Sequence, residues 1–106
     1  MSNVLGSGFL EKVYENALGY ELIKLGFQVQ QQWPIDVRYG DMVVGQYIAD
    51  LLVDDQVLVE IKAVKCLDDI HLAQCMNYLK ATGKTICLLL NFGSPRVDVK
   101  RIVNNF

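Results

Sequence analysis

The residues of this chain that could do chemistry together are Asp50, Glu60 and Lys62. Residues 47–53 and 56–62 are otherwise mostly apolar, apart from the polar residues at their ends, and are typical of two strands around an acidic turn. A buried or half-buried charge is costly unless it is paired or bound to a metal. Three such charges in one hairpin therefore predict a site, and we expect its ligand to be a divalent cation.

The length of the turn decides whether these side chains meet. A two-residue turn at Asp54 and Asp55 would send Asp50 and Glu60 to opposite faces of the hairpin. A three-residue loop, or a bulge, sets Asp50 opposite Glu60. One face then carries Ala49, Leu51, Val53, Val57, Val59 and Ile61. The other carries Ile48, Asp50, Leu52, Leu58, Glu60 and Lys62. We expect this second register because it separates the charges from a wholly apolar face.

Side by side on adjacent strands, the carboxylates of Asp50 and Glu60 offer hard oxygen ligands to Mg²⁺ or Mn²⁺. The carbonyl of Ile61 could supply a third oxygen, and Lys62 could hold an attacking water or stabilise charge on a phosphoryl group. These are the ingredients of phosphodiester hydrolysis. A plain ion pair between Glu60 and Lys62 is the alternative. The spacing alone leaves both interpretations open, because such a short motif has many chance matches.

A helix over residues 9–25 is predicted ahead of the hairpin. Its apolar stripe, at helical spacings, consists of Leu10, Val13, Tyr14, Ala17, Leu18, Leu22 and Leu25. Ser7 or Gly8 could cap its start, and Gly26 is expected to end it.

Three glutamates of this helix differ in their position relative to the stripe. Glu11 and Glu15 lie one turn apart at its margin, whereas Glu21 falls between Tyr14 and Leu18 at about 100° per residue. We expect Glu15 to be solvated. For Glu11 and Glu21 two interpretations stay open, a charge at the rim of the stripe or a functional carboxylate.

Three strands are predicted next, over residues 27–39, 42–53 and 56–61. Trp33 and Pro34 indicate a bulge or an edge position in the first, because proline cannot donate to a sheet ladder. The second strand is long, and Gly45 could kink it.

A second helix is expected to run to Thr82, with Asp68 or Asp69 as its cap and Gly83 as its end. Its core stripe is Leu72, Met76 and Leu79, and another face aligns His71, Gln74 and Tyr78. A lone histidine is more often a packing or surface residue than a ligand, so this polar stripe favours a functional interpretation only slightly.

Residues 85–91 form a continuous apolar run, as expected of a strand buried on both faces. Reaching it through a helix implies a right-handed parallel crossover from the preceding strand. Val97 and Val99 indicate a short last strand. The predicted order is αβββαβ with one extra strand, an α/β fold with a mixed sheet.

Length and composition predict one ordinary globular domain over all 106 residues, with 52% hydrophobic residues. No apolar run approaches the roughly 20 residues of a membrane span, and the first residues lack the features of a signal peptide. Three cysteines without a shared spacing, Cys66, Cys75 and Cys87, are expected to be reduced thiols in a cytoplasmic protein.

Residues 1–57 hold three basic and eight acidic side chains, whereas residues 58–106 hold seven basic and four acidic. The second half could therefore meet phosphates, although a mixed solvated surface explains it equally well.

The chain resembles a known family in several stretches. Gly-Phe-Leu-Glu-Lys-Val-Tyr at residues 8–14 matches the motif that names the GxxExxY family, and Asp50, Glu60 and Lys62 resemble the signature of the PD-(D/E)XK nuclease superfamily that contains it. The similarity covers nearly the whole chain and includes residues 47–53, 59–63, 71–74 and 88–92.

The resemblance implies a restriction-endonuclease-like fold, an αβββαβ core with a mixed sheet flanked by helices. It implies that Asp50 and Glu60 bind Mg²⁺ or Mn²⁺ and that Lys62 is the catalytic lysine. Glu11 would be a further acidic member of the site, and Gln74 and Tyr78 resemble a QxxxY element that faces the same cleft. The substrate it implies is nucleic acid, with DNA expected.

Two departures from the family pattern bear on function. Ile48 stands where relatives commonly carry a basic residue, and relatives usually have a helix ahead of residues 5–8. A second copy of the chain could cover an apolar patch exposed by the absence of that helix. The alternative to a nuclease is an inactive module of nuclease fold that binds nucleic acid or protein. A third alternative is a structural oligomer in which the hairpin charges form simple ion pairs.

Overall fold

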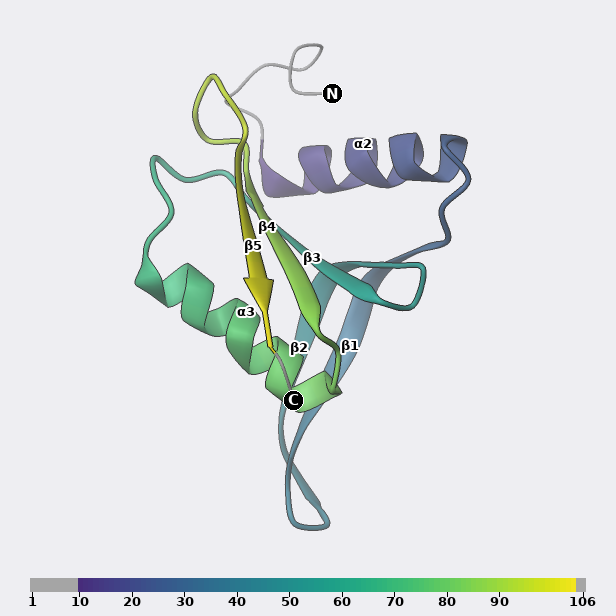
Figure 1. Ribbon diagram of the computed structural model, residues 1–106, viewed down its shortest axis with the longest axis vertical. Coiled ribbons are helices and arrows are strands. Elements are labelled where there is room, and N and C mark those ends of the chain that lie inside the picture. Colours follow the sequence, from purple (N-terminus) through teal and green to yellow (C-terminus); the bar gives the residue numbers. More distant parts are fainter. Residues whose placement is uncertain (1–9, 105–106) are drawn as a thin grey trace.

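Five strands form one sheet in the order β1-β2-β3-β4-β5 in the structure of the protein, a computed structural model that describes residues 10–104. The elements are α2 (Glu11–Lys24), β1 (Val29–Tyr39), β2 (Met42–Val53), β3 (Val57–Lys62), α3 (Asp69–Thr82), β4 (Ile86–Asn91) and β5 (Asp98–Val103). Figure 1 shows α2 near one end of the sheet and α3 nearer the other. The predicted element order is confirmed, and the last strand is present.

The helix ends follow local capping chemistry. The Asp68 side chain accepts a hydrogen bond from the Ile70 N–H at 2.9 Å, and the Asp68 N–H donates to His71 Nδ1 at 3.1 Å, so a capping box begins α3. Gly83 (φ 74°) and Gly26 (φ 96°) follow α3 and α2 in the left-handed conformation that glycine tolerates best. Asp68, Gly83 and Gly26 are confirmed as predicted, whereas the caps proposed at residues 7 and 8 lie outside the described residues.

The crossover through α3 joins β3 and β4 in parallel, as predicted, and the other neighbouring strands are antiparallel. β1 is an edge strand, which accommodates Pro34. The register between β1 and β2 shifts between Val37 and Arg38, opposite Gly45, where a kink was expected.

Two apolar cores lie on opposite faces of the sheet. The core beneath α3 is built from Ile35, Ala49, Leu52, Leu58, Cys75, Tyr78, Leu79, Cys87 and Leu89. The core beneath α2 is built from Tyr14, Leu51, Val53, Val59, Ile61 and Phe92. Of the described cysteines, Cys75 and Cys87 are buried, Cys66 is exposed and all are free thiols, as expected.

The turn between β2 and β3 has the three-residue loop that the charge pattern predicted. Val53 pairs with Val57, and the register continues to Leu51 and Val59. Asp54 and Asp55 adopt positive φ angles of 52° and 58°, which aspartate tolerates better than most residues.

The two faces of this hairpin differ from the prediction at Ala49. It lies in the core beneath α3, whereas Leu51, two residues on, lies in the core beneath α2. Gln32 has φ 54°, and pairing steps from Gln31–Leu51 to Trp33–Ala49 across it. The strands therefore change faces at this point, and strict alternation fails. The face predicted to carry the charges is also partly core, since it includes Leu52 and Leu58.

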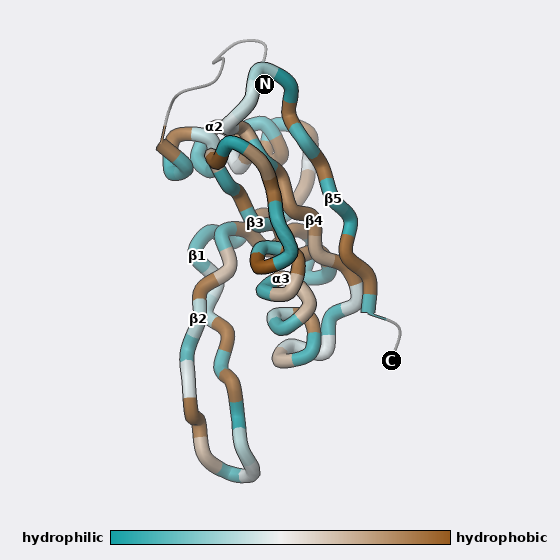
Figure 2. Tube along the Cα trace, turned by 90° about the vertical axis from the view of Figure 1, so that its left-hand side faces the viewer, coloured by the Kyte–Doolittle hydropathy of each residue, from teal (hydrophilic) through white to brown (hydrophobic). Residues whose placement is uncertain are grey.

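The far half of the β1–β2 hairpin projects beyond the rest of the molecule (Figure 2). We call residues 37–48 the hairpin arm. Its exposed large apolar side chains are Tyr39, Met42, Val43, Val44, Tyr47 and Ile48. Neither described helix is long and apolar enough to cross a membrane.

Candidate functional site

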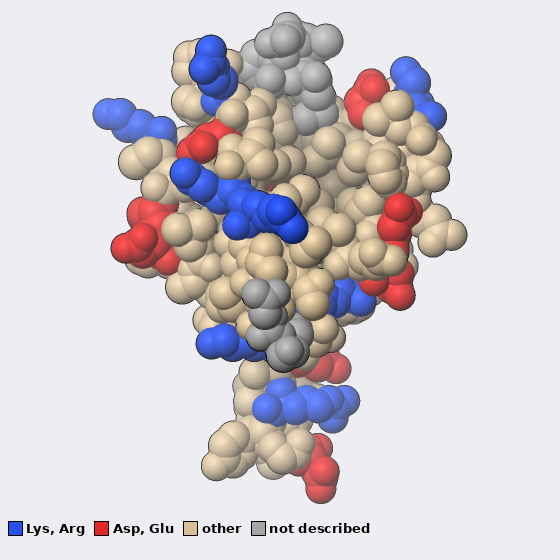
Figure 3. All heavy atoms as spheres, viewed as in Figure 1, with Lys and Arg blue, Asp and Glu red and all other residues tan. Residues whose placement is uncertain are grey.

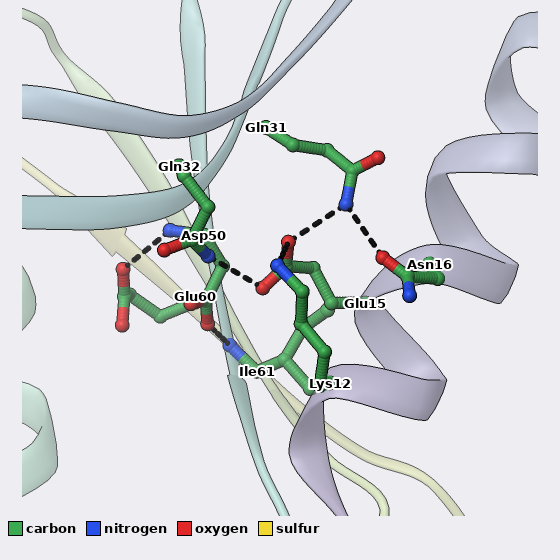
Figure 4. Close-up of polar contacts among 8 residues, drawn as sticks. All are labelled: Lys12, Glu15, Asn16, Gln31, Gln32, Asp50, Glu60 and Ile61. Carbon is green, nitrogen blue, oxygen red and sulfur yellow. Dashed lines mark hydrogen bonds and ion pairs between the residues drawn. The ribbon is translucent and has the colours of Figure 1, made fainter.

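Asp50 and Glu60 lie where β2 and β3 stop pairing. The backbone pairing ends at Leu51 and Val59. Beyond this pair, hydrogen bonds between side chains and backbone connect the two strands. Asp50 Oδ2 accepts a hydrogen bond from the Ile61 N–H at 2.7 Å, and Glu60 Oε1 accepts one from the Asp50 N–H at 3.1 Å. Figure 4 shows the two carboxylates side by side at this opening.

Burial dominates the electrostatics of these carboxylates. Only 3% of Glu60 is exposed, and burial, followed by the charge of Asp50, raises the pKa of Glu60 to about 8. Burial also raises the pKa of Asp50, against the Ile61 N–H bond, which lowers it. Lys62 lowers both pKa values by its charge. Two neighbouring carboxylates with raised pKa values form a place where a cation would be strongly stabilised.

The donor set fits a magnesium ion. Each carboxylate uses one oxygen for a backbone N–H, so its second oxygen can serve as a ligand. No group of three or more His, Cys, Asp and Glu side chains converges as a metal site within residues 10–104. Mg²⁺, however, typically takes only one or two protein carboxylates and keeps several waters. The structure ties Ile61 to the site through its N–H, while the ligand role of its carbonyl stays a prediction.

Lys62 and Glu11 border the opening. Lys62 ends β3 half-buried, and its carbonyl accepts the Phe92 N–H at 2.8 Å. Among the ion pairs of the described residues, none joins Lys62 to Glu60, so the simple ion pair is not formed. Glu11 Oε2 accepts the Ala63 N–H at 3.1 Å, which fixes the start of α2 beside the end of β3.

On α3, Tyr78 lies within electrostatic reach of the two carboxylates, and Gln74 bonds to Tyr78. Gln74 Nε2 donates to Tyr78 Oη at 3.0 Å, and Tyr78 is 5% exposed. Burial raises the pKa of Tyr78, and the charges of Glu60 and Asp50 raise it further, so the phenol keeps its proton. The third member of the predicted polar stripe, His71, caps α3 instead.

The expectation that Glu15 is solvated is wrong. It is 3% exposed, and its carboxylate accepts hydrogen bonds from Lys12 Nζ at 3.0 Å, Gln31 Nε2 at 2.7 Å and Gln32 Nε2 at 2.8 Å (Figure 4). Its charge contributes to the raised pKa of Asp50. A signal was present in the sequence: three consecutive glutamines at residues 30–32 of a strand need partners for their amides.

This contact explains the change of faces in the hairpin. Gln32 is held by Glu15 in a left-handed conformation that costs a non-glycine residue about 1–2 kcal/mol. Pairing skips Gln32 and Asp50 together, between the Gln31–Leu51 and Trp33–Ala49 pairs. Glu15 therefore helps to release Asp50 from the regular ladder.

A second buried polar side chain that the sequence analysis missed is Asn91, which holds the backbone just after Lys62 and which we call the Asn91 clamp. Asn91, 1% exposed, pairs with Lys62 across the parallel strands. Its Oδ1 accepts the N–H groups of Val64 and Gly93 at 3.0 Å each, and its Nδ2 donates to the Val64 carbonyl at 2.9 Å. A side chain at Gly93 would collide with the Val64 backbone, so glycine is required there.

Surface charge is mixed in sign. In Figure 3, Lys and Arg side chains gather over β5, while Asp and Glu side chains are spread around them. Lys100 and Arg101 of β5 are exposed. This face does not present a field of one sign.

A family model described as "PD-(D/E)XK nuclease superfamily" matches residues 1–102. Among solved structures, the alkaline exonuclease (LHK-Exo) from Laribacter hongkongensis has a TM-score of 0.65 at 19% identity, over 89% of this chain and 56% of that one. SSO0001 has a TM-score of 0.67 at 18% identity, over 99% of this chain and 53% of that one. These likenesses establish the fold, and the chain spans little more than half the length of either structure. Comparison with curated proteins gave no match.

Proposed function

Because the chain belongs to the PD-(D/E)XK nuclease superfamily, we propose that it is a metal-dependent nuclease that hydrolyses phosphodiester bonds of DNA. Nucleases of this superfamily generally use divalent metal ions. The observation that carries the proposal is the carboxylate pair of half-buried Asp50 and buried Glu60. Each accepts a backbone N–H from the other strand, and Lys62 follows Glu60 by two residues. An arrangement made only to stabilise the fold would gain more from apolar side chains at the same positions.

Each residue has a distinct role in this proposal. Asp50 and Glu60 hold Mg²⁺, with the Ile61 carbonyl as a third protein oxygen, and Mn²⁺ can take its place. The bound ion supplies a Lewis acid and a water of lowered pKa. The Lys62 ammonium orients the attacking water or offsets charge on a phosphoryl oxygen.

The second group of residues frames the reacting phosphate. Glu11 adds negative charge at the end of β3, where the Ala63 N–H fixes it. Tyr78 and Gln74 offer a phenol O–H and an amide as hydrogen-bond donors from α3.

Membership of the GxxExxY family is part of the proposal. The motif's Glu11 contacts the end of β3, and its Tyr14 is fully buried and stacks on Phe92 with ring centroids 4.5 Å apart. Both motif residues thus join α2 to the strand ends around the site, which supports a functional rather than a chance match.

An inactive module of nuclease fold that binds nucleic acid or protein is the second candidate. Exposed apolar side chains on and after α2, including Tyr20, Ile23 and Leu25, would let a second copy of the chain bind there.

A cleavage assay separates the two candidates. End-labelled single-stranded and duplex DNA is incubated with Mg²⁺ or Mn²⁺ and with wild type, Lys62→Ala or the exposed control Lys65→Ala. We expect cleavage that Lys62→Ala lowers about 100-fold and that Lys65→Ala leaves unchanged. Calorimetry should show Mg²⁺ binding that Asp50→Asn removes. Metal binding without cleavage would favour the module, and unchanged metal binding in Asp50→Asn would refute the site.

A further inference from the structure

A cavity of about 830 Å³ separates the hairpin arm from α3, and of its lining residues only Gln74 and Tyr78 have a role in the proposed function. Tyr47 and Arg38 line it from the arm, and Tyr78, Gln74 and Lys80 line it from α3. Pockets for small organic ligands span roughly 300–1,000 Å³. The cavity is therefore large enough for one nucleotide.

Tyr78 links the cavity to the candidate metal centre, although Asp50 and Glu60 are not part of the cavity lining. Tyr78 and Gln74 belong to its lining, and the same Tyr78 lies within electrostatic reach of Glu60 and Asp50. A group bound in the cavity would therefore lie on the Tyr78 side of a phosphate that a metal ion would hold at the two carboxylates.

Its walls offer flat apolar surfaces. The Tyr47 residue is 51% exposed, and its ring lies 5.8 Å from that of Tyr78, tilted by 47°. Tyr47 pairs with Ile35, which places both on the face of the sheet that α3 covers. Ile70, 76% exposed, adds an aliphatic surface from α3. Every nucleobase can stack on an exposed aromatic ring of this kind.

Charged and amide groups complete the lining. Arg38 and Lys80 are cations on opposite walls and can meet phosphates. Asp36 is the acidic residue of the lining, and it already contacts Arg38 at 4.0 Å and Gln46 Nε2 at 3.0 Å. The amides of Gln74 and Asn77 can bond the polar edges of a base.

We propose that this cavity binds an unpaired nucleobase of a nucleic-acid strand, on the Tyr78 side of the phosphate that a metal ion would hold at the Asp50–Glu60 centre. The inference rests on the proposed function and narrows its substrate to single strands or frayed ends. A base inside an intact duplex is covered on both faces by its neighbours and cannot enter a side pocket without leaving the stack.

The test measures binding separately from cleavage. Fluorescence anisotropy with a short labelled oligothymidylate and with a blunt duplex is recorded in EDTA, where no cleavage occurs. Tyr47→Ala should weaken single-strand binding about tenfold, while Tyr47→Phe keeps the ring and should bind like wild type. Tyr39→Ala is the matched control, because Tyr39 lies on the same arm, is 82% exposed and is absent from the cavity lining.

The outcomes distinguish this inference from the proposed function. Equal binding by wild type and Tyr47→Ala, or an equal loss in Tyr39→Ala, would overturn the base pocket even if Mg²⁺-dependent cleavage is found. A loss confined to Tyr47→Ala and to single strands supports the pocket even if wild type cleaves nothing. Sedimentation of each variant without DNA gives a further check. If Tyr47→Ala only dissociates a dimer and leaves oligothymidylate binding unchanged, the arm is a self-interface and the pocket is refuted.

Discussion

The β1–β2 hairpin has two parts that differ in burial. At its base, which we define as residues 29–35 and 49–53 with the α2 residues packed on them, polar side chains are buried. On the hairpin arm, apolar side chains are exposed. Near Asp50, the Glu15 carboxylate is 3% exposed and accepts three hydrogen bonds. On the arm, Tyr39 is 82% exposed and Met42 is 66% exposed. The same two strands thus run from a tightly specified site to a surface that the fold itself does not cover.

This difference indicates which part of the hairpin can tolerate amino-acid substitution. A buried polar group loses its partners and its solvation when a contact is removed, so the base should be sensitive to substitution. Exposed apolar side chains contribute little to stability because they remain in water in the folded state. The base fixes the geometry of the carboxylates, and the arm remains available for binding.

The largest effect is expected at Glu15. Glu15→Ala removes the acceptor of three charge-assisted bonds and frees Gln32 from its left-handed conformation, so we expect a loss of about 3 kcal/mol of unfolding free energy. Mg²⁺ affinity should fall with it, because Asp50 can return to the ladder. Urea unfolding and calorimetry measure the two effects. Glu21→Ala, on the same helix, is the control. An equal loss of unfolding free energy in Glu21→Ala would contradict a specific contribution of the Glu15 hydrogen bonds.

Asn91→Ala should cost about 2 kcal/mol, because it leaves the backbone of Val64 without its side-chain partners. This clamp follows Lys62, so kcat should fall more than KM rises if the lysine is displaced. Urea unfolding and steady-state cleavage report the two effects. Asn104→Ala, just after β5 and outside the cavity lining, is the control. A destabilised variant with unchanged kcat would limit Asn91 to a structural role.

Features of the hairpin and of the site could be predicted from the sequence where they depend on interactions between residues close together in the chain. The three-residue loop and the pairing of Val53 with Val57 follow from apolar alternation within one hairpin, and they are confirmed. The Asp68 cap and the Gly83 helix end are equally local and are also confirmed.

The missed features depend on contacts between distant segments. Glu15 is buried because β1 passes over α2 and brings Gln31 and Gln32 to its carboxylate. Ala49 changes faces because Gln32 adopts a positive φ angle, which no local propensity favours for glutamine. The catalytic and metal roles of Asp50, Glu60 and Lys62 remain predictions, although the structure brings these residues together.

The third effect is a dependence of stability and Mg²⁺ affinity on pH, caused by the raised pKa of Glu60. Glu60 has a pKa raised from 4.5 to about 8, so in the metal-free protein its stabilising contribution is complete below about pH 4.5 and is lost as pH rises toward 8. Mg²⁺ requires the ionised carboxylate, so its affinity should rise up to about tenfold per pH unit between pH 6 and 8. Calorimetry in buffers of different ionisation enthalpy should detect proton release on binding. Binding without proton release at pH 7 would contradict a protonated Glu60.

The smallest effect is expected on the arm, and it completes the contrast with Glu15. Met42 and Val44 are 66% and 57% exposed, so Met42→Ser and Val44→Thr should each change the unfolding free energy by less than about 0.5 kcal/mol. Measured by urea unfolding beside Glu15→Ala, they test whether the arm is independent of the base. A loss above about 2 kcal/mol from either change would mean that the arm is covered in solution. A dependence of that loss on protein concentration would identify the cover as a second copy of the chain.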